Sequence, residues 1–101
     1  MTDERSPVVI NATERGIAVI GEIDAATAPA VIAAATLSDR GHLEIELSGV
    51  DFIDSSGLRM LLQLHKRAIE IGGSVTLHRP SEAVRRLLAV SGVDEHLLIS
   101  E

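Results

Sequence analysis

Residues 42–71 place a strand pattern directly before a helix pattern, and this pairing limits the fold more than any other feature of the chain. Within His42–Ser48 every second residue is apolar, as in a strand with one buried face and one solvated face. From about Ser56 to Ile71 the apolar residues share one wide arc of a helical wheel, and Gly72-Gly73 ends the helix. A wide arc predicts a helix that lies between a sheet and a neighbouring element, or that has a partner of its own.

The remaining apolar runs predict further strands and helices on either side of this unit. Val8–Ile10 and Ile17–Ile20 are β-branched runs that a glycine-containing turn would join as a hairpin. The other predicted elements are a helix from the N-cap Thr27 to about Ser38, a strand at Ser74–His78, a helix from the N-cap Ser81 to Gly92, and a final strand or helix end at Leu97–Ile99. This order predicts an α/β sandwich, in which helices cover one face of a small mixed sheet of four to five strands.

Length and charge limit the organisation of the chain and its partners. We expect a polar tail at residues 1–7 and a single domain at 8–101, because 101 residues is the size of one domain. The tail lacks the apolar run of a signal peptide, and no stretch is long and apolar enough to span a bilayer, so we expect a cytoplasmic protein without a membrane partner. A formal net charge of −6 disfavours nucleic acid and favours a soluble monomer. Phe52 is the only aromatic residue, and we expect it in the core.

The connection Gly49–Leu58 is the most unusual stretch of the sequence. We interpret residues 49–54 as a segment between the strand and the helix, at the carboxyl end of a strand, where open α/β sheets place functional groups. The connection contains two carboxylates, two adjacent hydroxyls and a glycine. The alternative is capping alone, in which Asp54, Ser55 or Ser56 accepts hydrogen bonds from free N–H groups at the helix start.

Other chemistries find little support in the sequence. Without a Gly-x-Ser-x-Gly elbow or a phosphate-binding loop, we expect no enzyme, no catalytic residue and no cofactor. No metal site is expected either, because the four histidines lack metal-ligand spacing: His42, His65, His78 and His96. His65 falls inside the apolar arc of its helix and is interpreted as a boundary residue. The pair Lys66-Arg67 is interpreted as a solvated face, with an acidic partner as the alternative.

Asp54-Ser55-Ser56-Gly57-Leu58 before an apolar helix resembles the signature of the STAS domain family, specifically the bacterial anti-sigma factor antagonists. Further similar elements follow in the same order as in that family: Gly21-Glu-Ile-Asp24 with Thr27-Ala28, Ile71-Gly72-Gly73, and Ser81-Glu-Ala-Val-Arg-Arg-Leu87 with Ser91-Gly92. The resemblance therefore covers almost the whole chain.

The resemblance implies a partner-switching mechanism. The unphosphorylated antagonist would bind an anti-sigma factor that is also a serine kinase, and a sigma factor would be released. The kinase would then phosphorylate Ser55, and a PP2C-type phosphatase would reverse this. Asp24 and Asp54 correspond to the acidic positions of the family, and the implied partner-binding residues are Asp24, Asp54, Ser55, Ser56, Gly57 and Leu58. The alternative is a STAS scaffold or accessory subunit of a signalling or lipid-transport assembly, without a phospho-switch.

Two further expectations concern the local chemistry of this switch. Ser56 is the expected N-cap, which would engage its hydroxyl and favour Ser55 as the modified residue. A phosphate at the helix start could meet free N–H groups, such as those of Gly57 and Leu58, while Asp51 and Asp54 would oppose it. We therefore expect little internal refolding on phosphorylation.

Overall fold

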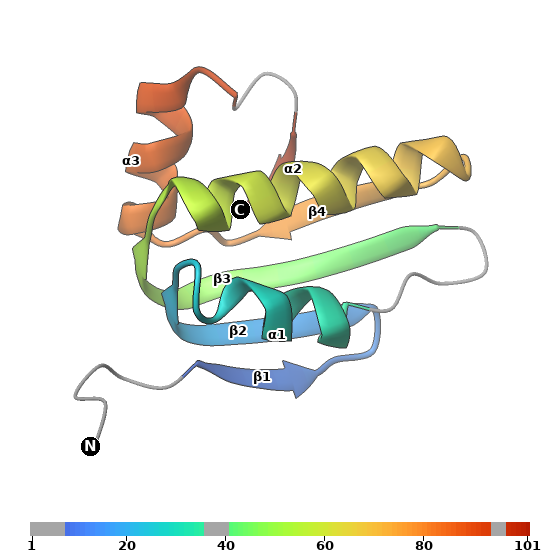
Figure 1. Ribbon diagram of the computed structural model, residues 1–101. Helices are drawn as coiled ribbons and strands as arrows, with labels where there is room; N and C mark the ends of the chain where they lie inside the picture. Colours follow the sequence, from blue (N-terminus) through green and yellow to red (C-terminus); the bar gives the residue numbers. More distant parts are fainter. Residues whose placement is uncertain (1–7, 36–40, 94–96) are drawn as a thin grey trace.

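A computed structural model describes residues 8–35, 41–93 and 97–101 as five strands and three helices (Figure 1). The elements are β1 (Val9–Ala12), β2 (Gly16–Ile23), α1 (Ala28–Ala34), β3 (His42–Ile53), α2 (Ser55–Glu70), β4 (Ser74–His78), α3 (Glu82–Ser91) and β5 (Leu98–Ser100). The strands form one sheet in the order β1-β2-β3-β4-β5. The hairpin strand β1 is antiparallel to β2, and the strands from β2 to β5 are parallel.

A helix connects each pair of neighbouring parallel strands, and the helices cover one face of the sheet (Figure 1). Right-handed crossovers between strands in sequential order place all the connecting helices on the same side. Helix α2 contacts β3, β4 and α1, as its wide apolar arc predicts. The mixed sheet with helices on one face confirms the predicted fold class, and β5 confirms a final strand near residues 97–99.

The core lies between the sheet and the helices because the strand register aligns the buried positions. Ile45 pairs with Ile17 on one side and with Leu77 on the other, and all are buried. The helices contribute further buried side chains to this layer, among them Val31, Met60, Leu61, Leu64, Val84 and Leu88.

Strand β3 is longer than the sequence indicates. Residues 49–53, interpreted as a connection, continue β3 to Ile53, and only Asp54 separates it from α2. The register against β2 shifts twice, so that the paired part of β3, residues 44–53, contains two residues more than β2. These bulges explain why the sequence pattern predicts a strand end near Ser48. After Leu47 the buried positions recur every third residue, at Val50 and Ile53, instead of every second.

Phe52 does not lie in the core, contrary to expectation. It pairs with Glu22 on the face of the sheet that the helices leave open, and it is 46% exposed. The buried positions of β3 on either side of it, Val50 and Ile53, point into the helix-covered layer. The shifted register therefore directs the only aromatic ring outward.

The helix caps are predicted correctly for α3 and only in part for α1. The Ser81 hydroxyl accepts a hydrogen bond from Val84 N at 3.3 Å, and Gly92 ends α3 with a φ of 73°. Thr27 is the N-cap residue of α1, but its side chain makes no capping bond to the helix. The helix ends at Ala34, since Ala35 is already extended, and the predicted end at about Ser38 lies outside the described residues.

The carboxylate of Glu46 is the centre of a charged network on the open face of the sheet. It accepts hydrogen bonds from the Ser48 hydroxyl at 2.6 Å and from Arg79 Nε at 3.0 Å, and His78 Nε2 lies 4.0 Å away. Burial raises the pKa of Glu46, but the hydrogen bonds from Ser48 and Arg79 and the charges of Arg79 and His78 together bring it below its ordinary value.

We expect Glu46→Gln to lower the free energy of unfolding by about 0.5–1 kcal/mol at neutral pH. Because the folded-state pKa is lowered, the carboxylate stabilises the fold above its unfolded-state pKa of about 4.3, and this contribution disappears as the pH falls through the folded-state pKa. Urea unfolding of both proteins at several pH values measures the difference. A difference that stays constant as the pH falls well below about 4 would contradict the lowered pKa.

Candidate functional site

The carboxyl ends of β2 and β3 bring two acidic loops together. Ile23 and Ile53 are the last paired residues of these parallel strands, and an aspartate follows each of them. The Asp54 N–H donates a hydrogen bond to the Ile23 carbonyl oxygen at 3.2 Å, which joins the two loops. The structure therefore places Asp24 and Asp54 in adjacent loops at the same edge of the sheet.

Asp24 shapes the first loop from a buried position, since it is only 5% exposed. Its Oδ1 accepts hydrogen bonds from the N–H groups of Ala26 at 2.9 Å and Thr27 at 3.1 Å. In return the Thr27 hydroxyl accepts one from Asp24 N at 2.9 Å, and it lies 2.8 Å from the Glu22 carbonyl oxygen. Sequence reasoning missed this role of Thr27, although the Asp-x-x-Thr spacing of a capping box is a readable signal for it.

Asp54 caps α2, and the expectation that Ser56 is the N-cap is wrong. The Asp54 Oδ1 accepts hydrogen bonds from Ser56 N at 2.9 Å and from Gly57 N at 3.2 Å, while Leu58 N donates to the Asp54 carbonyl oxygen at 3.0 Å. The N–H groups of Gly57 and Leu58 are therefore engaged, contrary to expectation. A carboxylate at this position also interacts favourably with the helix dipole.

Ser55 and Ser56 differ in their exposure, whereas the hydrogen bonding of their hydroxyl groups is the same. Ser55 is the first residue of α2 and is exposed, whereas Ser56 is half-buried. Within the described part of the chain, neither hydroxyl forms a hydrogen bond. An engaged Ser56 hydroxyl therefore no longer distinguishes them, but accessibility still favours Ser55 as a group that an enzyme or a partner can reach.

Gly57 and Leu58 lie beneath this surface and support it. Leu58 is buried in the core, and Gly57 is buried against the ends of β2 and β3. A Cβ atom on Gly57 would lie 2.7 Å from Ile53 Cγ1 and 3.0 Å from the Ile23 carbonyl oxygen. The accessible part of the predicted partner surface is thus Ser55, with the half-buried Asp54 and Ser56 beside it.

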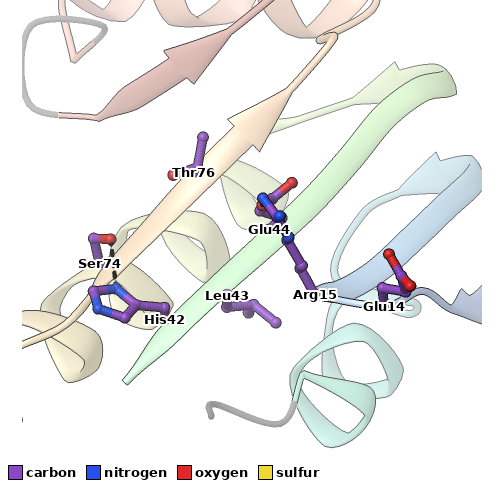
Figure 2. A pocket seen from close by; sticks show the side chains of 7 residues that line it. All are labelled: Glu14, Arg15, His42, Leu43, Glu44, Ser74 and Thr76. Atoms are coloured by element: carbon purple, nitrogen blue, oxygen red, sulfur yellow. Dashed lines mark hydrogen bonds and ion pairs between the residues drawn. The ribbon is translucent and has the colours of Figure 1, made fainter. Parts of the chain in front are cut away.

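A hollow at the other end of the strands shows no comparable arrangement (Figure 2). It has a volume of about 400 Å³ and lies where β3 and β4 begin, with His42 Nδ1 3.0 Å from the Ser74 hydroxyl and Arg15 paired with Glu44 at 3.3 Å.

Over residues 8–35, 41–93 and 97–101, no three His, Asp or Glu side chains are grouped so that they could hold a metal ion. Within the same ranges every helix is too short or too polar to cross a bilayer.

Comparison with known proteins agrees with this fold. The family model described as "Mlab, STAS domain" matches residues 8–100. An anti-sigma factor antagonist from Mycobacterium paratuberculosis superposes with a TM-score of 0.77 at 27% identity, over 99% of this chain and 90% of that one. A putative anti-sigma factor antagonist from Thermotoga maritima gives 0.75 at 20% identity, over 93% and 86% of the two chains. The antagonist SpoIIAA in its unphosphorylated form gives 0.67 at 20% identity, over 93% and 88%. Because the family match spans nearly every residue of the described fold, the chain belongs to the STAS domain family.

Proposed function

We propose that this protein is an anti-sigma factor antagonist whose unphosphorylated form binds an anti-sigma factor serine kinase, and whose binding is switched off by phosphorylation of Ser55. The observation that supports this most directly is the position of Ser55: an exposed hydroxyl, without a hydrogen bond among the described residues, on the first residue of a firmly capped helix. Family membership and the 27% identical antagonist are consistent with the same function.

The proposed activity is binding, and the chemistry belongs to the partners. The kinase brings the nucleotide, and a PP2C-type phosphatase restores the free hydroxyl. The chain itself would act in the cytoplasm as a monomer without a cofactor. Ser55 and five neighbours make up the proposed partner-binding site: Asp24, Asp54, Ser56, Gly57 and Leu58. The more buried of them would act by fixing the start of α2, on which Ser55 is presented.

The Asp54 cap explains why a phosphate on Ser55 would stay at the surface. The N–H groups of Ser56, Gly57 and Leu58 already bond to Asp54, so a phosphate could reach them only by displacing its carboxylate or by breaking a helical hydrogen bond. The negative charge of Asp54 also opposes a second anion nearby. The backbone N–H groups of the helix start therefore do not absorb the added charge, which stays at the surface that the partner would meet.

The test of the proposed function is phosphorylation by a purified anti-sigma factor kinase with ATP. We expect mass spectrometry to find one added phosphate, located on Ser55. The Ser55→Ala variant should gain none, and the matched Ser56→Ala variant should be modified like the native chain. Phosphorylation of Ser55→Ala to the native extent would disprove the site. Tight binding without any modification would instead favour a STAS scaffold or accessory subunit.

A further inference from the structure

The basic residues of α2 differ from the other basic residues of the structure. Elsewhere among the described residues each arginine pairs with a glutamate: Arg15 with Glu44, Arg79 with Glu46, Arg85 with Glu101 and Arg86 with Glu82. Arg59, Lys66 and Arg67 of α2 form no ion pair and no side-chain hydrogen bond within the described part of the chain. On a protein with a net charge of −6, these are the cations that an acidic partner would meet unneutralised.

Two of these cations lie on the same exposed side of α2 as Ser55. At about 100° per residue, Arg59 and Lys66 fall within about 40° of Ser55 around the helix axis, and Arg67 lies further around. All these side chains are exposed. With a rise of about 1.5 Å per residue, the row from Ser55 to Lys66 is about 16 Å long, which is roughly three turns of a facing helix. We call Arg59, Lys66 and Arg67 the basic row.

An apolar groove between α1 and α2 runs beside the end of the basic row. It has a volume of about 350 Å³, and its lining includes Ile32 from α1 together with Leu64, Lys66, Arg67 and Glu70 from α2. Leu64 is 1% exposed and Ile32 is half-buried, so the floor is apolar. Helix α1 contains no charged residue, so the charges of the rim come from α2 alone, where Lys66 and Arg67 outnumber Glu70.

We propose that Ser55, the basic row and this groove form one continuous docking surface for an acidic amphipathic helix of the partner protein. Carboxylates of that helix would face Arg59, Lys66 and Arg67, and an apolar side chain would enter the groove over Leu64. This inference rests on the proposed function, because it assigns the chemistry of the partner bound there. It also explains the switch: a phosphate on Ser55 lies one turn before Arg59, where it neutralises the row and repels the partner's carboxylates.

The test is calorimetric titration of the unphosphorylated protein with the kinase that modifies Ser55. Arg59→Glu and Lys66→Glu are each compared with Arg15→Glu, which changes another exposed arginine, far from α2, so that all variants change the net charge equally. We expect about tenfold weaker binding for the α2 variants and less than about twofold for the control. Added salt should also weaken native binding more than that of the α2 variants. Equal loss for all three would overturn the docking surface while leaving the Ser55 switch intact.

A second probe separates failure of the surface from failure of the proposed function. A synthetic helix with glutamates beside a leucine stripe, and its lysine counterpart, are titrated while amide chemical shifts are recorded by NMR. We expect the acidic peptide to change amide chemical shifts in α1 and α2 only, and the lysine peptide to change none. This result is expected even if no kinase is found. Equal shifts with both peptides, or binding of phosphatidylglycerol vesicles that Lys66→Glu abolishes, would overturn the proposal of a protein partner.

Discussion

Phosphorylation of Ser55 is expected to weaken binding to the anti-sigma factor kinase several-hundred-fold, which corresponds to about 3–4 kcal/mol. The phosphate adds about 1.5–2 negative charges at an exposed position, and no free N–H group of Ser56, Gly57 or Leu58 is available to neutralise them. Binding would therefore require a partner shaped for a neutral hydroxyl to desolvate a dianion. Titration of the separated phosphorylated and unphosphorylated proteins with the kinase measures the loss directly.

Variants separate the charge from the loss of the hydroxyl. Ser55→Ala should bind like the unphosphorylated protein, because the hydroxyl forms no hydrogen bond within the described chain. Ser55→Asp carries less charge than a phosphate and should lose only part of the affinity. Asn11→Asp, at an exposed position on β1 where the side chain forms no hydrogen bond within the described chain, controls for a general effect of one more negative charge. Equal affinity for Ser55→Ala and Ser55→Asp would contradict the electrostatic account.

The fold follows from local patterns that the sequence displays, and its errors occur where distant contacts override those patterns. Alternation in His42–Ser48 and the helical arc after Ser55 are local, and both predictions agree with β3 and α2. The end of β3 was missed because its two bulges exist only in the pairing with β2. The exposure of Phe52 is a consequence of that same register, which no property of the residue itself encodes.

The structure brings the predicted site residues together at one edge of the sheet, but the sequence assigned the hydrogen bonds among them to the wrong side chains. Asp54 and Ser56 are both good N-caps, and the choice depends on where the backbone leaves the sheet. The hydrogen bond from Asp54 N to the Ile23 carbonyl oxygen extends the strand pairing to Asp54 itself, which leaves its side chain in position to cap α2. The contact between this loop and the Asp24 loop likewise depends on the parallel pairing of β2 with β3.

The role of Gly57 illustrates how this packing reverses an ordinary helix preference. Within a helix, alanine is normally more stable than glycine by about 1 kcal/mol. We expect the opposite for Gly57→Ala, with a free energy of unfolding about 1–3 kcal/mol lower, because the new methyl group would overlap Ile53 and Ile23. Thermal unfolding should show a drop in the midpoint of roughly 4–8 °C per kcal/mol for a domain of this size. Ser56→Ala is the matched control, since it adds helix propensity at a half-buried neighbouring position and should be neutral or slightly stabilising. A Gly57→Ala protein more stable than the native chain would show that the helix can move away without cost.

The same substitution tests whether the position of Ser55 matters to the partner beyond its chemistry. Because one of the contacts is the backbone oxygen of Ile23, at 3.0 Å, relief of the overlap at Gly57 would include a movement of the first turn of α2 away from the ends of β2 and β3. That movement would shift Ser55 and weaken the Asp54 cap, although both side chains remain present. At a temperature where the variant is still folded, we therefore expect about tenfold weaker kinase binding and slower phosphorylation of an intact Ser55. If Gly57→Ala lost stability but kept native affinity, the partner would bind Ser55 by adapting to its new position. The packing of Gly57 beneath Ser55 would then stabilise the fold without contributing to partner binding.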